Sequence, residues 1–110
     1  MSDAVGAVLA ALADPTRRAI VETLVREGST SVPLLRESFP ITRQALAKHL
    51  ATLGDAGLVE RAEGAGGREV RYRLRPGALH PTARWLQATE AAWDDRLIRL
   101  KRAVEEPRTG

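Results

Sequence analysis

The chain has 110 residues, 44% of them apolar and 28% charged, which is the length and composition of one soluble globular domain. It has no cysteine, so disulfides, thiolate metal sites and cysteine nucleophiles are excluded. No apolar run approaches the roughly 18 residues of a membrane span, and Met1-Ser2-Asp3 lacks the basic stretch of a signal peptide, so a cytoplasmic location is expected.

The net charge of +3 is modest, but it is unevenly placed. Residues 61–75 hold five arginines and two glutamates, so the excess positive charge is concentrated in this segment, just after the middle of the chain. A local basic segment of this kind attracts a phosphate backbone. The alternative is an arginine-rich surface strand that keeps a sheet edge soluble.

Two helices are predicted at the start of the chain. Ser2 or Asp3 can cap a first helix to about Ala13, and Asp14-Pro15 can begin a second that runs to about Glu27 before Gly28. The first helix has one apolar stripe, formed by Val5, Val8, Leu9 and Leu12. The second is expected to bury Ile20, Val21, Leu24 and Val25. Thr16, Arg17 and Arg18 could contact phosphate, although solvent exposure or a salt bridge inside the domain is the preferred interpretation.

The next segment predicts a helix-turn-helix. Ser31 can cap a short helix with Pro33 in its first turn and Leu34, Leu35 and Phe39 toward the core, and Pro40-Ile41 forms the turn. Thr42 then caps a helix of about residues 42–54, in which Leu46, Leu50 and Leu53 share one face. The opposite face carries Gln44, Lys48, Ala51 and Thr52, and its short side chains and donors suit a DNA groove.

A β-hairpin is predicted at about residues 58–75. Leu58 to Arg61 forms one strand, glycines occupy the tip, and residues 68–74 alternate. Val70, Tyr72 and Leu74 point to one side, whereas Glu69, Arg71 and Arg73 point to the other. This hairpin beside a groove-reading helix would be a wing. Its tip lacks the strand-to-helix context of a nucleotide-binding loop.

A long last helix is predicted at about residues 81–105, and Pro107 to Gly110 is expected to fray. Leu86, Trp93, Leu97, Leu100 and Val104 follow helical spacing, with Trp85 at the flank. A helix this long must extend past so small a domain, so we expect it to pair with a second subunit together with the first helix. The alternative is that it folds back on its own core.

In order and in residues, the chain resembles the ArsR/SmtB family of winged-helix repressors. The resemblance rests on residues 12–24, LADPTRRAIVETL, on residues 41–60, ITRQALAKHLATLGDAGLVE, and on residues 67–74 and 85–100, GREVRYRL and WLQATEAAWDDRLIRL. The fold class expected is mainly α with a small β-hairpin wing, in the order α-α-α-α-β-β-α. The whole of residues 1–110 would form one winged helix-turn-helix domain that dimerises through its first and last helices.

The resemblance implies a homodimeric repressor that binds an inverted-repeat operator in double-stranded DNA. The recognition-helix positions would be Thr42, Arg43, Gln44, Ala45, Lys48 and His49, and the wing contacts Arg68 and Arg71, with Arg73 a further candidate. The dimer interface would comprise Val5, Val8, Leu12, Trp85, Leu86, Trp93, Leu97 and Leu100.

The chain departs from the metal-sensing members of that family. Residues 31–39 contain no cysteine, and the two histidines, His49 and His80, lie 31 positions apart, too far for a compact zinc site. We therefore expect no metal and no cofactor. His49 could contact phosphate or pack at the flank of the leucine face, and His80 is expected in a loop. Nothing in the sequence marks an effector site.

Three other functions are compatible with a winged-helix sequence or with a small globular chain. A winged helix that binds protein instead of DNA is disfavoured by the basic wing and by a recognition face without an acid. An enzyme is disfavoured because no paired acids or nucleophile with histidine share a spacing that would form one site. An activator remains open, since only the position of the operator relative to the promoter distinguishes it from a repressor.

Overall fold

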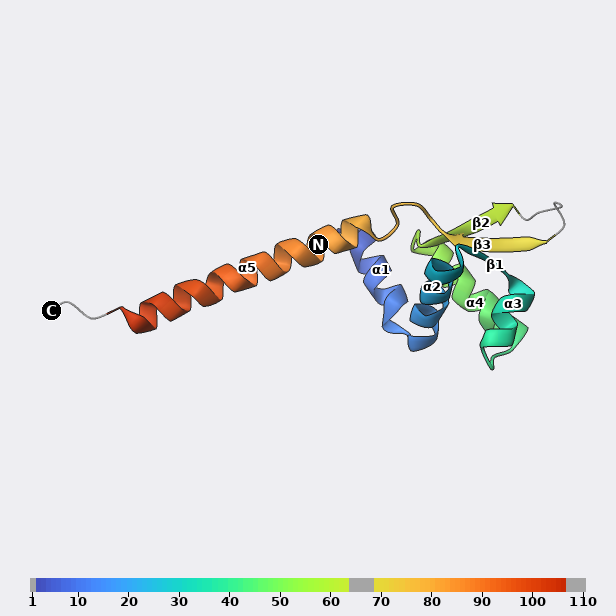
Figure 1. Ribbon diagram of the computed structural model, residues 1–110, viewed down its shortest axis with the longest axis horizontal. Helices are drawn as coiled ribbons and strands as arrows, with labels where there is room; N and C mark the ends of the chain where they lie inside the picture. The colour runs from blue at the N-terminus through green and yellow to red at the C-terminus, as the bar shows by residue number, and fades with distance from the viewer. Residues whose placement is uncertain (1, 64–68, 107–110) are drawn as a thin grey trace.

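The computed structural model describes residues 2–63 and 69–106. Five helices and three strands follow one another along the chain: α1 (Asp3–Ala13), α2 (Pro15–Glu27), β1 (Ser29–Ser31), α3 (Val32–Ser38), α4 (Arg43–Asp55), β2 (Val59–Glu63), β3 (Val70–Leu74) and α5 (His80–Glu105). The first four helices and the strands form a compact unit from which α5 projects (Figure 1), so the molecule measures 78 × 26 × 24 Å. The predicted mainly helical fold with a small wing is confirmed.

The predicted helix starts follow from side-chain caps. Asp14 Oδ2 accepts the backbone N–H of Arg17 at 2.9 Å, and Ser31 Oγ accepts that of Leu34 at 3.3 Å. Gly28 ends α2 with φ +81°, a left-handed conformation that glycine adopts without strain. These caps satisfy backbone groups that the helix itself cannot pair.

The core lies beneath the leucine face of α4. Leu46 and Leu53 are fully buried, and they pack with Ile20 and Leu24 of α2 and with Leu58. Tyr72 and Leu74 of β3 pack against the same cluster, which ties the wing to the helices. Because its predicted leucine stripe is buried, the opposite face of α4 is turned toward solvent.

The sheet has one strand more than the predicted hairpin. The order is β1-β3-β2, and β1 pairs antiparallel with β3 so that Ser29 lies opposite Arg73 and Ser31 opposite Arg71. The sequence of β1, Ser-Thr-Ser, has no apolar alternation, so only its pairing with β3 makes it a strand. This third strand anchors the base of the wing to the segment between α2 and α3.

Some predicted core positions are wrong. Val25 is 61% exposed and Leu34 is 49% exposed, because each lies at the edge of its helix's apolar stripe, beyond the part that another element covers. Val70 is 45% exposed, although it was expected on the covered side of the wing. The last helix begins at His80, one residue earlier than expected, and Thr82 is its one buried residue among those described.

Metal-ligating side chains do not cluster within the part of the chain that the structure describes. Among residues 2–63 and 69–106, no group of three histidine, cysteine or acidic side chains could hold an ion. Within the same residues, no helix is both long and apolar enough to cross a membrane.

Candidate nucleic-acid interface

The exposed face of α4 begins at a capped first turn. Thr42 Oγ1 accepts the backbone N–H of Ala45 at 3.0 Å, which fixes where the helix starts. Arg43, Gln44 and Lys48 are all exposed on the first two turns. In the part of the chain that the structure describes, neither Arg43 nor Lys48 has an acidic partner. Two free cations and an amide therefore lie together on the face opposite the core, where they can donate to base edges or phosphates.

Ala45 and His49 are the other recognition positions, and both are half-buried. His49 lies within electrostatic range of Asp14, the N-cap residue of α2. The pKa of Asp14 lies below its usual value, first because its carboxylate accepts the Arg17 N–H, and to a smaller extent because of the charges of Arg17 and His49. His49 is thus half-buried, unlike the exposed Arg43, Gln44 and Lys48 of the same helix.

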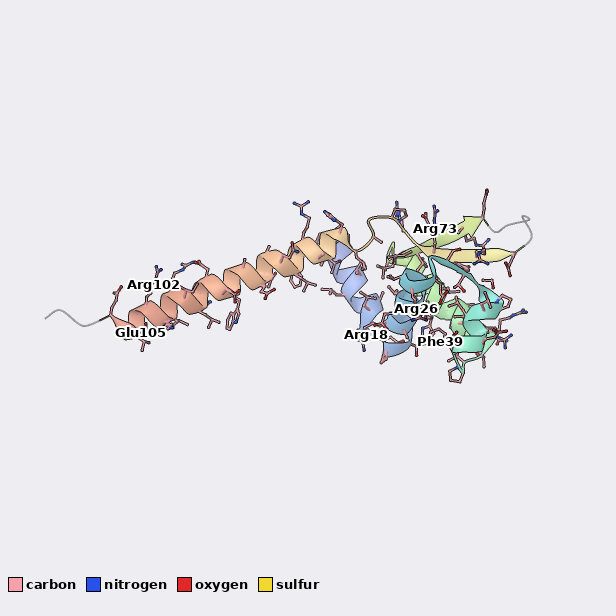
Figure 2. All side chains as sticks on the ribbon, viewed as in Figure 1. Arg18, Arg26, Phe39, Arg73, Arg102 and Glu105 are labelled. Atoms are coloured by element: carbon pink, nitrogen blue, oxygen red, sulfur yellow. The ribbon has the colours of Figure 1, made fainter. Side chains whose placement is uncertain are left out.

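Arg17 and Arg18 have a role that the sequence did not predict. Arg17 Nε donates to the carbonyl of Ala11 at 2.7 Å, and Arg18 Nη1 donates to the carbonyl of Leu12 at 2.9 Å (Arg18 is labelled in Figure 2). Both guanidinium groups therefore cap the last turn of α1, where free carbonyls and the helix dipole favour a cation. Arg18 is exposed, as the preferred interpretation expected, but both arginines bond to backbone carbonyls of α1 instead of forming the salt bridge that was the other expectation.

Two arginines of the wing are bonded within the sheet, which its composition did not indicate. Arg71 Nη2 donates to the carbonyl of Ser29 at 3.0 Å, Nε donates to Ser29 Oγ at 3.2 Å, and Nη1 pairs with Glu69 at 3.1 Å. Arg73 (Figure 2) pairs across the hairpin with Glu60 at 3.1 Å. The predicted free basic face is therefore largely paired within the sheet. Arg68, the remaining predicted wing contact, lies outside the described residues.

The apolar stripe of α5 has no partner within the described part of the protomer. Figure 2 shows that the side chains along most of this helix meet no other element of the chain. Trp85 is half-buried near α1. Beyond it the stripe is open: Leu86 is 50%, Trp93 59%, Leu97 44% and Leu100 55% exposed.

The predicted interface residues of α1 are buried or partly buried, in contrast to the exposed stripe of α5. Val5 and Val8 are only 4% and 5% exposed, and Leu12 is partly buried against the core. These three side chains are largely covered by their own protomer. They leave little surface for direct contact with a partner.

Comparison with known proteins agrees with this geometry. The family described as a helix-turn-helix domain matches residues 12–62. An ArsR-like transcriptional regulator from Rhodococcus sp. RHA1 superposes with a TM-score of 0.78 at 40% sequence identity, and the match covers 96% of this chain and 95% of that one. The chain belongs to the ArsR family of transcriptional regulators. The family resemblance seen in the sequence is thereby confirmed.

Two further relatives show how far the likeness extends. The transcriptional repressor BigR from Xylella fastidiosa is 29% identical, with a TM-score of 0.57 over 76% of this chain and 84% of that one. The HTH-type transcriptional regulator Rv2034 of Mycobacterium tuberculosis is 47% identical over 63% of this chain. The chain spans less than two thirds of the length of the curated relatives that it matches, 62% in the case of Rv2034. All three named relatives are described as regulators of transcription, not as enzymes.

Proposed function

We propose that this protein is a homodimeric repressor that binds an inverted-repeat operator in its own or a neighbouring promoter. The observation that carries the proposal is the outer face of α4, where Arg43, Gln44 and Lys48 are exposed and neither cation has an ion-pair partner among the described residues. A helix with free donors on one face and three buried leucines on the other can enter a major groove without losing its own packing.

Within this interface each side chain has a distinct role. Gln44 reads a base, because its amide can pair with both N6 and N7 of adenine. Arg43 and Lys48 bind guanine or phosphate. Thr42 starts the helix at the groove, and Ala45 keeps its flank narrow enough to approach the bases. His49 is half-buried at the edge of this interface, where it either packs against its own domain or contacts phosphate.

The wing contributes affinity more than specificity. In our proposal Arg68 clamps the flanking DNA backbone, whereas Arg71 and Arg73 hold the hairpin in the position from which it can do so. The support for this division is that Arg71 is already bonded to Ser29, and Arg73 to Glu60, within the sheet. Phosphate contacts of this kind fix the register of a protein on the duplex without reading sequence.

Dimerisation would bury the open stripe of α5. A helix of 26 residues is about 39 Å long by its rise per residue, and Leu86, Trp93, Leu97 and Leu100 lie along one side of it. Exposed apolar surface of this extent marks an interaction site. A twofold axis through the paired helices would set the two recognition helices about 34 Å apart, one turn of DNA. Val5, Val8 and Leu12 would act by positioning α1 behind this interface.

Repression follows if the occupied operator excludes RNA polymerase. The name of BigR as a transcriptional repressor supports this sign of regulation. An activator on the same fold would differ in where its operator lies relative to the promoter.

The test is a pair of substitutions on α4 with a matched control on α5. Gln44→Ala and Lys48→Ala together should abolish sequence-specific binding to the operator while the dimer remains intact. The control is Gln87→Ala with Lys101→Ala, which makes the same chemical changes at exposed positions of α5. Fluorescence anisotropy gives the affinity, and sedimentation gives the oligomeric state. Unchanged affinity in the α4 variant would remove the recognition-helix assignment.

A further inference from the structure

A cavity of about 670 Å³ lies between α4, the first turn of α3 and the wing. This volume falls in the range of small-molecule sites, about 300–1,000 Å³. The three elements lie on the side of the domain away from α5 (Figure 1), so the long helix does not cover the cavity. Its wall is mostly apolar and includes Val32, Pro33, Ala47, Ala51, Val70 and Tyr72.

The charge around this cavity is uneven. Asp55 lines it from the last turn of α4, where the helix carbonyls add partial negative charge. No side chain of residues 2–63 or 69–106 forms an ion pair with Asp55. Glu69 also lines the cavity, but Arg71 neutralises it at 3.1 Å. Arg43 lines the cavity as well, but from the first turn of α4, 12 residues before Asp55 and about 18 Å away from it along the helix axis.

The proposed DNA contacts leave Asp55 unexplained. A carboxylate between the recognition helix and the wing repels a phosphate backbone and so weakens DNA binding. It also stands at the end of a helix where an acid is unfavourable. A carboxylate without an ion-pair partner among the described residues, beside an apolar and partly aromatic wall, is, however, the combination that recognises an organic cation.

We propose that this cavity binds a small amphiphilic cation. The apolar or aromatic body of the ligand lies between Ala51 of α4 and Val70 and Tyr72 of β3, and its positive group lies at Asp55. Because the cavity separates the recognition helix from the wing, a bound cation occupies space that the duplex needs. The ligand therefore releases the operator, and this regulatory part rests on the proposed function.

Direct binding is tested first, without DNA. Tetraphenylphosphonium and tetraphenylborate have nearly the same size and shape but opposite charge. Titration calorimetry should show the cation binding at one site per protomer and the borate binding more weakly. Amide shifts in the NMR spectrum should change in α4 around Ala51 and in β3 around Val70. Equal binding of the two ions, or shifts confined to α5, would overturn the proposal.

Asp55→Asn tests the charged end of the cavity. Loss of a partly exposed ion pair should weaken tetraphenylphosphonium binding about two- to fivefold. The matched control is Asp94→Asn, which makes the same charge change at an exposed position of α5 and should leave binding unchanged. An equal effect of both variants would mean that Asp55 acts only through net charge, and the site assignment would fail.

Competition with DNA is the last step. Tetraphenylphosphonium should weaken binding of the wild-type protein to the operator, and higher concentrations should be needed with Asp55→Asn. If the cation fills the cavity and DNA remains bound with equal affinity, the regulatory part is overturned. If the protein binds no DNA at all, the proposed function fails, whereas the calorimetry and NMR still decide whether the cavity takes a cation.

Discussion

Replacing Arg71 by alanine separates a structural role in the wing from a DNA contact. The guanidinium group makes two hydrogen bonds to Ser29 and an ion pair with Glu69, and the Arg71 side chain is 24% exposed. The ion pair is near the surface and contributes little. The two bonds from a charged, half-buried donor contribute most of an expected loss of about 2 kcal/mol in the free energy of unfolding.

Urea denaturation measures this loss. With a slope of about 1.5 kcal/mol per molar urea, the midpoint should fall by about 1.3 M. All variants must be compared at one protomer concentration, because a dimer's stability depends on it. Arg61→Ala is the control, since Arg61 is exposed on β2 and has no ion pair among the described residues. It should leave the midpoint almost unchanged.

DNA binding by the same variants completes the test. A side chain that neutralises one phosphate per protomer contributes about 0.9 to the slope of log K against log salt for each contact. Arg71→Ala should leave that slope unchanged, because in our account Arg71 does not touch phosphate. Unchanged stability together with a reduced salt slope would refute the reasoning and return Arg71 to the DNA interface.

Three further predictions concern other elements. Trp93→Glu should dissociate the dimer in sedimentation, because it places a charge in the apolar stripe of α5, whereas Gln87→Ala should not; a dimeric Trp93→Glu variant would exclude this stripe as the interface. Arg17→Ala should lower the free energy of unfolding by about 1 kcal/mol, because the carbonyl of Ala11 loses its cap. Thermal unfolding measures this loss, and a variant as stable as the wild-type protein would contradict the prediction. The lowered pKa of Asp14 means that its stabilisation is complete above the unfolded-state value of about 3.9 and is lost as the pH falls through the folded-state pKa. In the Asp14→Asn variant the free energy of unfolding should therefore depend less on pH in this acid range. An unchanged pH dependence would contradict the assigned role of Asp14.

Local chemistry made most helices predictable. A cap hydroxyl or carboxylate acts on an N–H three residues later, so Asp14, Ser31 and Thr42 identify helix starts without knowledge of the rest of the fold. The leucine spacing of α4 likewise predicts both its buried face and, by exclusion, its exposed one. The outer face of α4 could therefore be proposed from sequence.

Interactions between distant residues could not be predicted in this way. Arg71 is bonded to Ser29, 42 positions earlier, and only the pairing of β1 with β3 brings them together. The same pairing makes a strand of a segment without apolar alternation. Val25 and Leu34 were wrongly predicted to be buried. The spacing of apolar residues shows which side of a helix faces the core, but not how much of that side another element covers. The wing was thus predicted as an element, while the pairing of its arginines was not.

The central claim, a dimer that reads DNA sequence through α4, is tested most directly by one titration. The purified protein is added to its own upstream DNA and to a scrambled duplex of equal length, at several salt concentrations. We expect tight binding to the upstream DNA at two protomers per site, with much weaker and more salt-dependent binding to the scrambled duplex. Absence of binding to either duplex, even at low salt, would contradict it and favour a winged helix that binds another protein.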